Sequence, residues 1–460
     1  MWQQCLPAFS QQRCWERGGQ LALSNLINFG KHTITGALGA GGRQDVDWSA
    51  AYRLFERQRF AVEHLFDVPL KTVIAALPPG HPVIASVDDT LLRKTGKKIY
   101  GASWKRDPLG PKFTTNFVWA QRWLQISLAL PEAGGRCRAI PVDFHHCPSA
   151  VKPGKKAGAD ELAEYGKRKK EMALPLKAKE RIELLRNQIP SSRKLVISGD
   201  GGYTNRTVCR NLPSNTTLLG RARKDAKLFA LPDNINGCGR KRLYGKQLPT
   251  PENMRLDDTI SWREVNAATG DKMHTFKIKS VAGVRSQIAG RRDLKLIIVQ
   301  PLRYRLTPKS KLLYRAPAYI ISTDPDLTDA EILQWYLWRW EIELNFRDEK
   351  SILGLNEAMI RTPDAVASWA PFVVCSYAML LLAGSAVQEG NKIPGITPKW
   401  QKATPPYRPS TNHYLAVMRQ EIYGLSWNNY LEGFRAHQPM SMKPLLFVPN
   451  IKTAILSARR

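Results

Sequence analysis

Hydrophobic residues in the first 78 positions recur at the three- to four-residue spacing of a helix, as at Leu23, Leu26 and Ile27. Gly30 separates two short helical pieces in this region. Two interpretations are open for the pair: a helix-turn-helix that binds DNA, or a plain helical bundle. We therefore expect a helical N-terminal domain over residues 1–78, with DNA binding as one of its two possible roles.

The pattern changes after residue 79, where short apolar runs rich in β-branched and aromatic residues predict strands. Five strands are expected, at residues 83–87, 113–130, 139–144, 195–198 and 216–219, with a helical stretch at 160–189 broken near Pro175. This order predicts an α/β domain with a mixed five-stranded sheet flanked by helices. Acidic residues end two of the strands: Asp88 and Asp89 follow the first, and Asp200 follows the fourth.

Residues 221–322 alternate strand-like runs with turn signals, which predicts a β-rich insertion. The segment 221–309 holds 20 Lys and Arg against 8 Asp and Glu, so the insertion is basic. One long helix is expected afterwards, from Thr328 to about Leu353. Thr328 is suited to be its N-cap, with Glu331 completing a capping box.

Residues 368–387 form an uncharged stretch of 20 residues, long enough to cross a membrane. The stretch contains Pro371, Gly384 and several serines, which favours a buried core helix, and we expect no membrane contact. Residues 391–410 contain five prolines and predict an extended segment, so residues 391–460 are assigned to a Pro-rich segment and C-terminal tail.

The composition of the chain also indicates the kind of partner that it binds. The chain of 460 residues is 43% hydrophobic, enough for a globular core, and carries a formal net charge of +30. A soluble protein this basic usually binds a polyanion, and nucleic acid is the usual one. Seven cysteines at wide spacing, without a Cys-x-x-Cys pair, indicate reduced thiols in a cytosolic protein.

The predicted helix at 328–353 carries four polar residues on one stripe: Tyr336, Arg339, Glu343 and Lys350. At about 100° per residue, the later three lie within about 60° of Tyr336. An ordinary core helix does not present such a stripe. The alternative is a solvated face in which Arg339 and Glu343, four residues apart, form an ion pair.

The stripe, read as YLWRWEIELNFRDEK, resembles the Tyr-Arg-Glu-Lys signature of bacterial insertion-sequence DDE transposases. SVDDT and VISGDGGY resemble the two Asp motifs of these enzymes, and the order of the three motifs also agrees. The resemblance implies an RNase H-like catalytic domain made of residues 79–220 and 323–390, interrupted by the insertion at 221–322.

The resemblance implies that Asp88, Asp200 and Glu343 are catalytic and hold Mg²⁺, with Mn²⁺ as a substitute. Carboxylate oxygens suit these hard ions, and phosphodiester cleavage by two metals needs several such ligands. Asp88 and Asp89 compete for the first position, because neighbouring strand residues face opposite ways. The Asp-x-Thr pattern of the family favours Asp88.

Tyr336, Arg339 and Lys350 are then expected to contact DNA phosphates near the cut, together with Lys105 and Arg106 from the basic run after the first acid. The implied function is transposition: binding of terminal inverted repeats, cleavage, and joining of 3′-hydroxyls to target DNA by a homodimer in the bacterial cytoplasm. Two alternatives are an RNase H-like nuclease without strand transfer and a repurposed DNA-binding protein without catalysis.

Overall fold

The structure is a computed structural model that describes residues 1–107, 110, 111, 113–232, 242–270, 272–305, 307, 309–389 and 408–423. Residues 391–407 of the predicted Pro-rich segment at 391–410, and residues 424–460 of the tail, lie outside the described residues.

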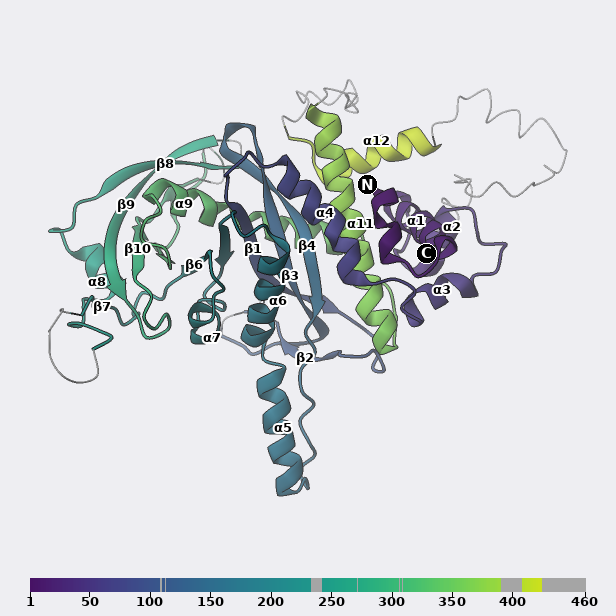
Figure 1. Ribbon diagram of the computed structural model, residues 1–460, viewed down its shortest axis with the longest axis horizontal. Helices are drawn as coiled ribbons and strands as arrows, with labels where there is room; N and C mark the ends of the chain where they lie inside the picture. The colour runs from purple at the N-terminus through teal and green to yellow at the C-terminus, as the bar shows by residue number, and fades with distance from the viewer. Residues whose placement is uncertain are drawn as a thin grey trace.

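The first 78 residues are helical, as predicted. They contain a short 3₁₀ helix, Trp2–Ala8, and four α-helices: α1 Gln12–Ile27, α2 Ile34–Ala40, α3 Ser49–Glu56 and α4 Val62–Ala76. These helices gather around the long helix α11, Pro363–Glu389 (Figure 1). Their apolar side chains belong to the same core cluster as those of the central sheet. DNA binding by α1 and α2 stays a prediction.

The predicted five strands are present as β1 Val83–Arg93, β3 Phe117–Glu132, β4 Arg136–His146, β5 Leu195–Gly199 and β6 Thr216–Arg221. They form a mixed sheet: β3 is antiparallel to β1 and β4, whereas β5 is parallel to β1 and β6. A short edge strand, β2 Ser103–Arg106, pairs with the outer part of β3.

Strand β1 is longer than the sequence predicts. The apolar run ends at Val87, but the strand continues through both acids to Arg93, because β3 pairs with it over its whole second half. Thr90 and Leu92 are buried, so the apolar side chains that keep this part in the sheet resume beyond the acids. The acids therefore lie within a strand and not at its end.

The sheet is also wider than the predicted five strands, since the described residues form a sheet of eleven strands. The additional strands of the 221–322 segment are β7 Phe229–Ala230, β8 Arg263–Thr269, β9 Lys272–Arg285, β10 Leu294–Val299 and β13 Ala318–Ser322. β13 pairs with β6 and β10 pairs with β13, so these strands continue the central sheet. They cover the open edge of β6, which would otherwise expose unpaired backbone groups. The segment also contains α8 Pro251–Leu256 and a small pair of strands, β11 Arg303–Tyr304 with β12 Leu313–Tyr314.

The single helix expected from Thr328 is two helices, α9 Asp329–Trp338 and α10 Glu341–Ser351. The capping box of Thr328 and Glu331 is present as predicted. Around Arg339 the backbone hydrogen bonds span three residues, as in Arg339 N to Tyr336 O at 3.2 Å and Glu343 N to Trp340 O at 3.1 Å. This tighter 3₁₀-like turn divides the helix.

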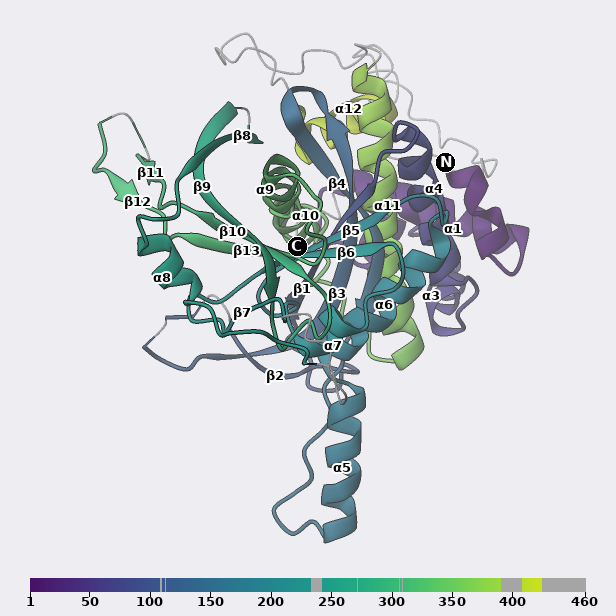
Figure 2. The ribbon, with the colours of Figure 1, turned by 60° about the vertical axis from the view of Figure 1, so that its left-hand side comes forward.

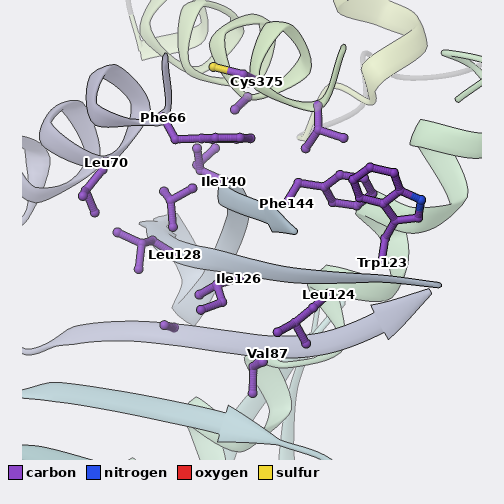
Figure 3. Close-up of a cluster of buried hydrophobic side chains, with 14 of the residues drawn as sticks. Phe66, Leu70, Val87, Trp123, Leu124, Ile126, Leu128, Ile140, Phe144 and Cys375 are labelled. Carbon is purple, nitrogen blue, oxygen red and sulfur yellow. The ribbon is translucent and has the colours of Figure 1, made fainter. Parts of the chain in front are cut away.

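Helices cover both faces of the sheet. On one face, α4 and α11 cover β4, and Figure 3 shows Phe66 of α4 and Cys375 of α11 above Ile140 and Phe144. On the other face, side chains of α9 pack in a second cluster with Ile84 of β1. Between β4 and β5 the chain forms α5 Ala159–Glu171 and α6 Leu174–Gln188, and α7 Arg206–Arg210 precedes β6.

Helix α11 contains the uncharged stretch that resembled a membrane span. It is the one helix in the described residues long and apolar enough to cross a membrane, and 83% of its most apolar window is buried inside the protein. It packs against β4, α1, α3 and α4, which is the arrangement expected of a core helix. The last described helix, α12 Thr411–Tyr423, also packs on it.

Candidate active site

The three predicted acids come from three elements that meet on one face of the sheet. Val87 of β1 is paired with Gly199 of the parallel strand β5, so the next residues, Asp88 and Asp200, lie side by side along the two strands. Glu343 lies in the first turn of α10, which contacts β1. A hydrogen bond from the Ser198 hydroxyl to the Trp335 carbonyl, at 3.2 Å, ties β5 to α9 directly before this site.

Arg339 joins two of the acids. Its Nη1 is 3.1 Å from Asp88 Oδ2, and its Nη2 is 3.1 Å from Glu343 Oε1. The guanidinium thus lies between a strand residue and a helix residue that are 255 positions apart in the sequence. The ion pair of Arg339 with Glu343, considered from sequence as a feature of a solvated face, is instead part of a partly buried cluster, because only 14% of the arginine side chain is exposed.

The pKa values of the acids show that they influence one another. Burial raises the pKa of Asp88 to about 7, the Arg339 charge opposes this, and the Asp200 charge adds to it. Burial also raises the pKa of Glu343. The Arg339 charge again opposes this increase, and the Asp200 charge again adds to it. Because Asp200 acts on both groups, the three carboxylates share one electrostatic environment.

The two neighbouring acids of β1 face opposite sides of the sheet. Asp88 faces α9 and α10, as its ion pair with Arg339 shows. Asp89 accepts a hydrogen bond from the Tyr203 hydroxyl at 2.9 Å and pairs with Arg122 at 3.3 Å. Of the two residues, the structure therefore brings Asp88, and not Asp89, to Glu343.

The predicted stripe is only partly assembled. Tyr336 lies beneath Arg339, whose guanidinium carbon is 5.9 Å from the ring centroid, and burial raises the pKa of the tyrosine. Lys350 lies further along α10 over Phe346, at 5.8 Å from its ring, and its pKa is lowered by burial and by the Arg93 charge. Tyr336, Arg339 and Glu343 thus form one group, whereas Lys350 lies outside it, over Phe346.

The two predicted DNA contacts on β2 differ in exposure. Arg106 is exposed, as a phosphate contact requires. Lys105 is 6% exposed, and its ammonium donates to the Ser149 hydroxyl, so it does not reach the surface in this structure. Burial lowers the pKa of Lys105 to about 8.

Tyr203 and Glu349 are buried polar residues near the site to which the sequence reasoning assigned no role. Tyr203 follows Asp200 by one turn and supports Asp89 from the far face of the sheet. Glu349 of α10 is fully buried beside Gln125, the β3 residue that pairs with Asp88, and burial raises the pKa of Glu349 to about 8. The fixed backbone pairing of β1 with β3 was the missing signal, since no local pattern places Gln125 opposite Asp88.

The donor set suits a divalent metal ion. Across the described ranges, no three His, Cys, Asp or Glu side chains lie close enough together to hold one ion. The Arg339 guanidinium balances the charges of Asp88 and Glu343 instead, in the place where a cation bound to both would lie. Carboxylate oxygens are the ligands that Mg²⁺ prefers, and an ion bound to both acids would displace the Arg339 guanidinium from them.

A family model described as "DDE superfamily endonuclease" matches residues 3–286, more than half of the chain. The chain belongs to the DDE superfamily endonuclease family. Its mixed α/β fold is consistent with a nuclease of the DDE or RNase H-like type, and membership supports a nuclease activity. The match includes Asp88 and Asp200 but ends before α9 and α10, so it does not cover Glu343, which the structure brings to Asp88 through Arg339. No curated protein matches the chain.

Proposed function

We propose that the protein is a DNA transposase of a bacterial insertion sequence. It binds the terminal inverted repeats of its element, cleaves at the ends and joins the 3′-hydroxyls to target DNA. The observation that carries the proposal is the cluster of Asp88, Arg339 and Glu343 beside Asp200 in a DDE superfamily endonuclease. The proposal of transposition as the reaction rests on a resemblance: the spacing of Tyr336, Arg339, Glu343 and Lys350 is similar to the transposase signature.

Asp88, Asp200 and Glu343 would hold Mg²⁺, or Mn²⁺ in its place, and Asp88 rather than Asp89 would be the first ligand. When bound there, the metal supplies Lewis-acid stabilisation of the attacking and leaving oxygens of the phosphodiester. Asp88 lies within the paired strand β1, and Asp200 directly follows β5, where its Oδ1 accepts a hydrogen bond from the Gly202 amide at 2.7 Å, so both carboxylates are positioned before any ligand arrives.

Arg339 and Tyr336 would bind the phosphate next to the cut. Arg339 has two Nη groups already directed at oxygens, and a phosphate offers the same kind of acceptor as the carboxylates it now contacts. In this proposal the guanidinium exchanges a carboxylate for a phosphate oxygen when DNA binds. Lys350 and Arg106 would contact phosphates further from the cut.

The partners in this proposal are double-stranded DNA of the element ends and of the target. Transposition requires both ends of the element to be held together, so the active form is a homodimer on DNA. The net charge of +30 suits such a partner and the bacterial nucleoid, in the cytoplasm, as its location.

One alternative has an observation in its favour. The family is described as an endonuclease, so a nuclease that cuts without joining fits the same carboxylates. The two functions differ in the product: only a transposase links the cleaved 3′ ends covalently to a second DNA molecule.

The decisive experiment combines the protein with Mg²⁺, DNA carrying the flanks of its own gene, and a supercoiled target plasmid. Cleavage at the ends and insertion into the plasmid are expected for the wild type and not for Asp200→Asn. Cleavage without insertion would favour the nuclease. If both proteins bind the ends and neither cuts them, the catalytic proposal is wrong.

A further inference from the structure

Helix α5 projects from the body of the protein as an arm (Figures 1 and 2). We define the α5 arm as residues 150–171, which are α5 and the segment that leads to its outer end. No side chain of α5 is buried, so the helix packs no face against the core. The surface of the helix is therefore open to solvent in the described part of the chain.

The topology places the arm at the same edge of the sheet as the acids. Helix α6 returns the chain to the start of β5, so the first residue of α6 lies near the carboxyl end of β5. Asp200 follows directly from that carboxyl end. Because α5 immediately precedes α6, the base of the arm lies at the edge of the sheet where Asp200 is found. Helix α6 packs beside α4, as the hydrogen bond of Gln188 to Asp67 at 3.1 Å shows, so the arm starts from the face opposite the one to which Asp88 points.

The base of the arm is strongly basic. Lys167, Arg168, Lys169 and Lys170 are all exposed in the last turns of α5, and Arg168 also pairs with Glu164 at 2.9 Å. The segment leading to the tip adds three exposed lysines, and the acids of the arm lie mainly in the first half of α5. The arm holds seven cations (Lys152, Lys155, Lys156, Lys167, Arg168, Lys169, Lys170) and four acids (Asp160, Glu161, Glu164, Glu171).

The distribution of charges along α5 also stabilises the helix in the absence of a partner. Asp160 and Glu161 lie at its N-terminus and the cations at its C-terminus, each near the end of the helix dipole that stabilises it. The arm offers little apolar surface, with Leu162 and Val151 as its exposed large hydrophobic residues. Protein interfaces usually exclude charge from their centre, whereas phosphate backbones bind clustered Lys and Arg.

We propose that the α5 arm binds the phosphate backbone of the DNA duplex that flanks the cleaved bond. This inference rests on the proposed function and extends it by a second contact surface outside the catalytic cluster. Contacts to phosphate carry no sequence information, so the arm adds affinity and orientation for any duplex that extends past the cut. With 13 residues, α5 is about 20 Å long, which corresponds to about six base pairs.

The test uses the full-length protein in EDTA and a variant with Lys167→Ala, Lys169→Ala and Lys170→Ala. Binding is measured by fluorescence anisotropy on end-containing duplexes that stop at the cut or extend about ten base pairs beyond it. Losing three phosphate contacts lowers the salt slope by about 2.7, so between about 50 and 200 mM salt the wild type loses about 40-fold more affinity than the variant. This difference is expected on the extended duplex alone.

A matched control lies on the same helix. Asp160→Asn, Glu161→Gln and Glu164→Gln together remove three acids from α5 and should leave the affinity equal or higher. Both variants should melt within a few degrees of the wild type, because no α5 side chain is buried and only exposed charges near the ends of the helix change. Equal loss of affinity in both variants would overturn the proposal, since the charge would then not be responsible.

Other outcomes separate this proposal from the proposed function. If the wild type binds and cuts DNA and the triple lysine variant keeps the wild-type salt slope, only the arm proposal is overturned. Wild type that binds no DNA overturns both. A lysine variant that changes oligomeric state without DNA, measured by light scattering, also overturns the arm proposal, because the surface would then serve a second copy of the chain.

Discussion

The two faces of strand β1 treat neighbouring aspartates differently. On one face, Asp88 contacts a single arginine that is shared with Glu343. On the other, Asp89 is held by a tyrosine hydroxyl and a second arginine. The first arrangement leaves carboxylate oxygens that can exchange partners, and the second satisfies its carboxylate within the fold. Identical side chains one residue apart thus have different surroundings, and only Asp88 has those expected of a catalytic acid in the proposed function.

The largest effect that sharpens this comparison is expected from Asp88→Asn. Loss of one of three charged ligands should reduce the rate of end cleavage at least ~10³-fold, an effect of the size seen when a catalytic group is removed. Binding of the ends without metal should persist. Asp89→Asn is the matched control and should keep cleavage within about tenfold while lowering the melting temperature. Equal loss of cleavage in the two variants would contradict the distinction between the faces.

A smaller effect is expected from Arg339→Ala, which removes the cation shared by Asp88 and Glu343. Cleavage should fall about 10²-fold, because a phosphate contact near the cut is lost. Without DNA, Mn²⁺ should bind more tightly than to the wild type, since the ion no longer competes with a guanidinium; calorimetry measures this. Arg339→Lys keeps the charge and should show a smaller gain in Mn²⁺ affinity. Weaker Mn²⁺ binding to Arg339→Ala would count against the exchange of partners.

The comparison extends to β2, where Lys105 and Arg106 also face opposite ways. Arg106→Ala should weaken duplex binding about fivefold and reduce the salt slope by about one, as for a single phosphate contact. Lys105→Ala should leave the slope unchanged and alter the melting temperature, because Lys105 is buried against Ser149. Anisotropy titrations at several salt concentrations measure both slopes, and a reduced slope for Lys105→Ala would show that this side chain reaches DNA.

The smallest effect concerns Glu349, buried on the Asp88 side of the sheet. Its pKa of about 8 in the folded protein lies above the unfolded value of 4.5, so the folded state retains the proton longer. Stability from this group is present below about pH 4.5 and is lost as the pH rises toward 8. Glu349→Gln should therefore raise the melting temperature by about 2 °C or more at pH 8 and little at pH 5. An equal change at both pH values would rule out the titration of Glu349 as the cause.

Much of the fold follows from local patterns. The helical start of the chain, the five central strands and the capping box of Thr328 and Glu331 agree with the sequence, because each depends on residues close together in the chain. The continuation of β1 beyond Asp88 and the joining of β13 to β6 depend on partners far along the chain, and local apolar runs do not report them. The division of α9 from α10 depends on backbone hydrogen bonds that the side-chain pattern does not specify.

The sequence likewise predicted some parts of the candidate site and not others. The helical spacing of Tyr336, Arg339 and Glu343 was enough to group them, since an approximate 100° step survives the tighter turn. Lys350, two turns further on, lies with Arg93 instead. Burial of Lys105 could not be foreseen from its basic run, because it depends on the approach of Ser149 to the edge strand.

The parallel pairing of Val87 with Gly199 has a further consequence for the geometry of the proposed metal site. Asp88 lies within strand β1, and Asp200 is the first residue after the last paired residue of β5, so the strand pairing positions the backbone of both acids. Glu343 comes from a helix that begins after the 3₁₀-like turn, and it is the acid whose distance from the other two can adapt. If the three acids hold a metal ion as proposed, the shape of residues 339–343 would set the size of ion that fits, and sequence changes in this turn would alter the preference between Mg²⁺ and larger ions such as Ca²⁺.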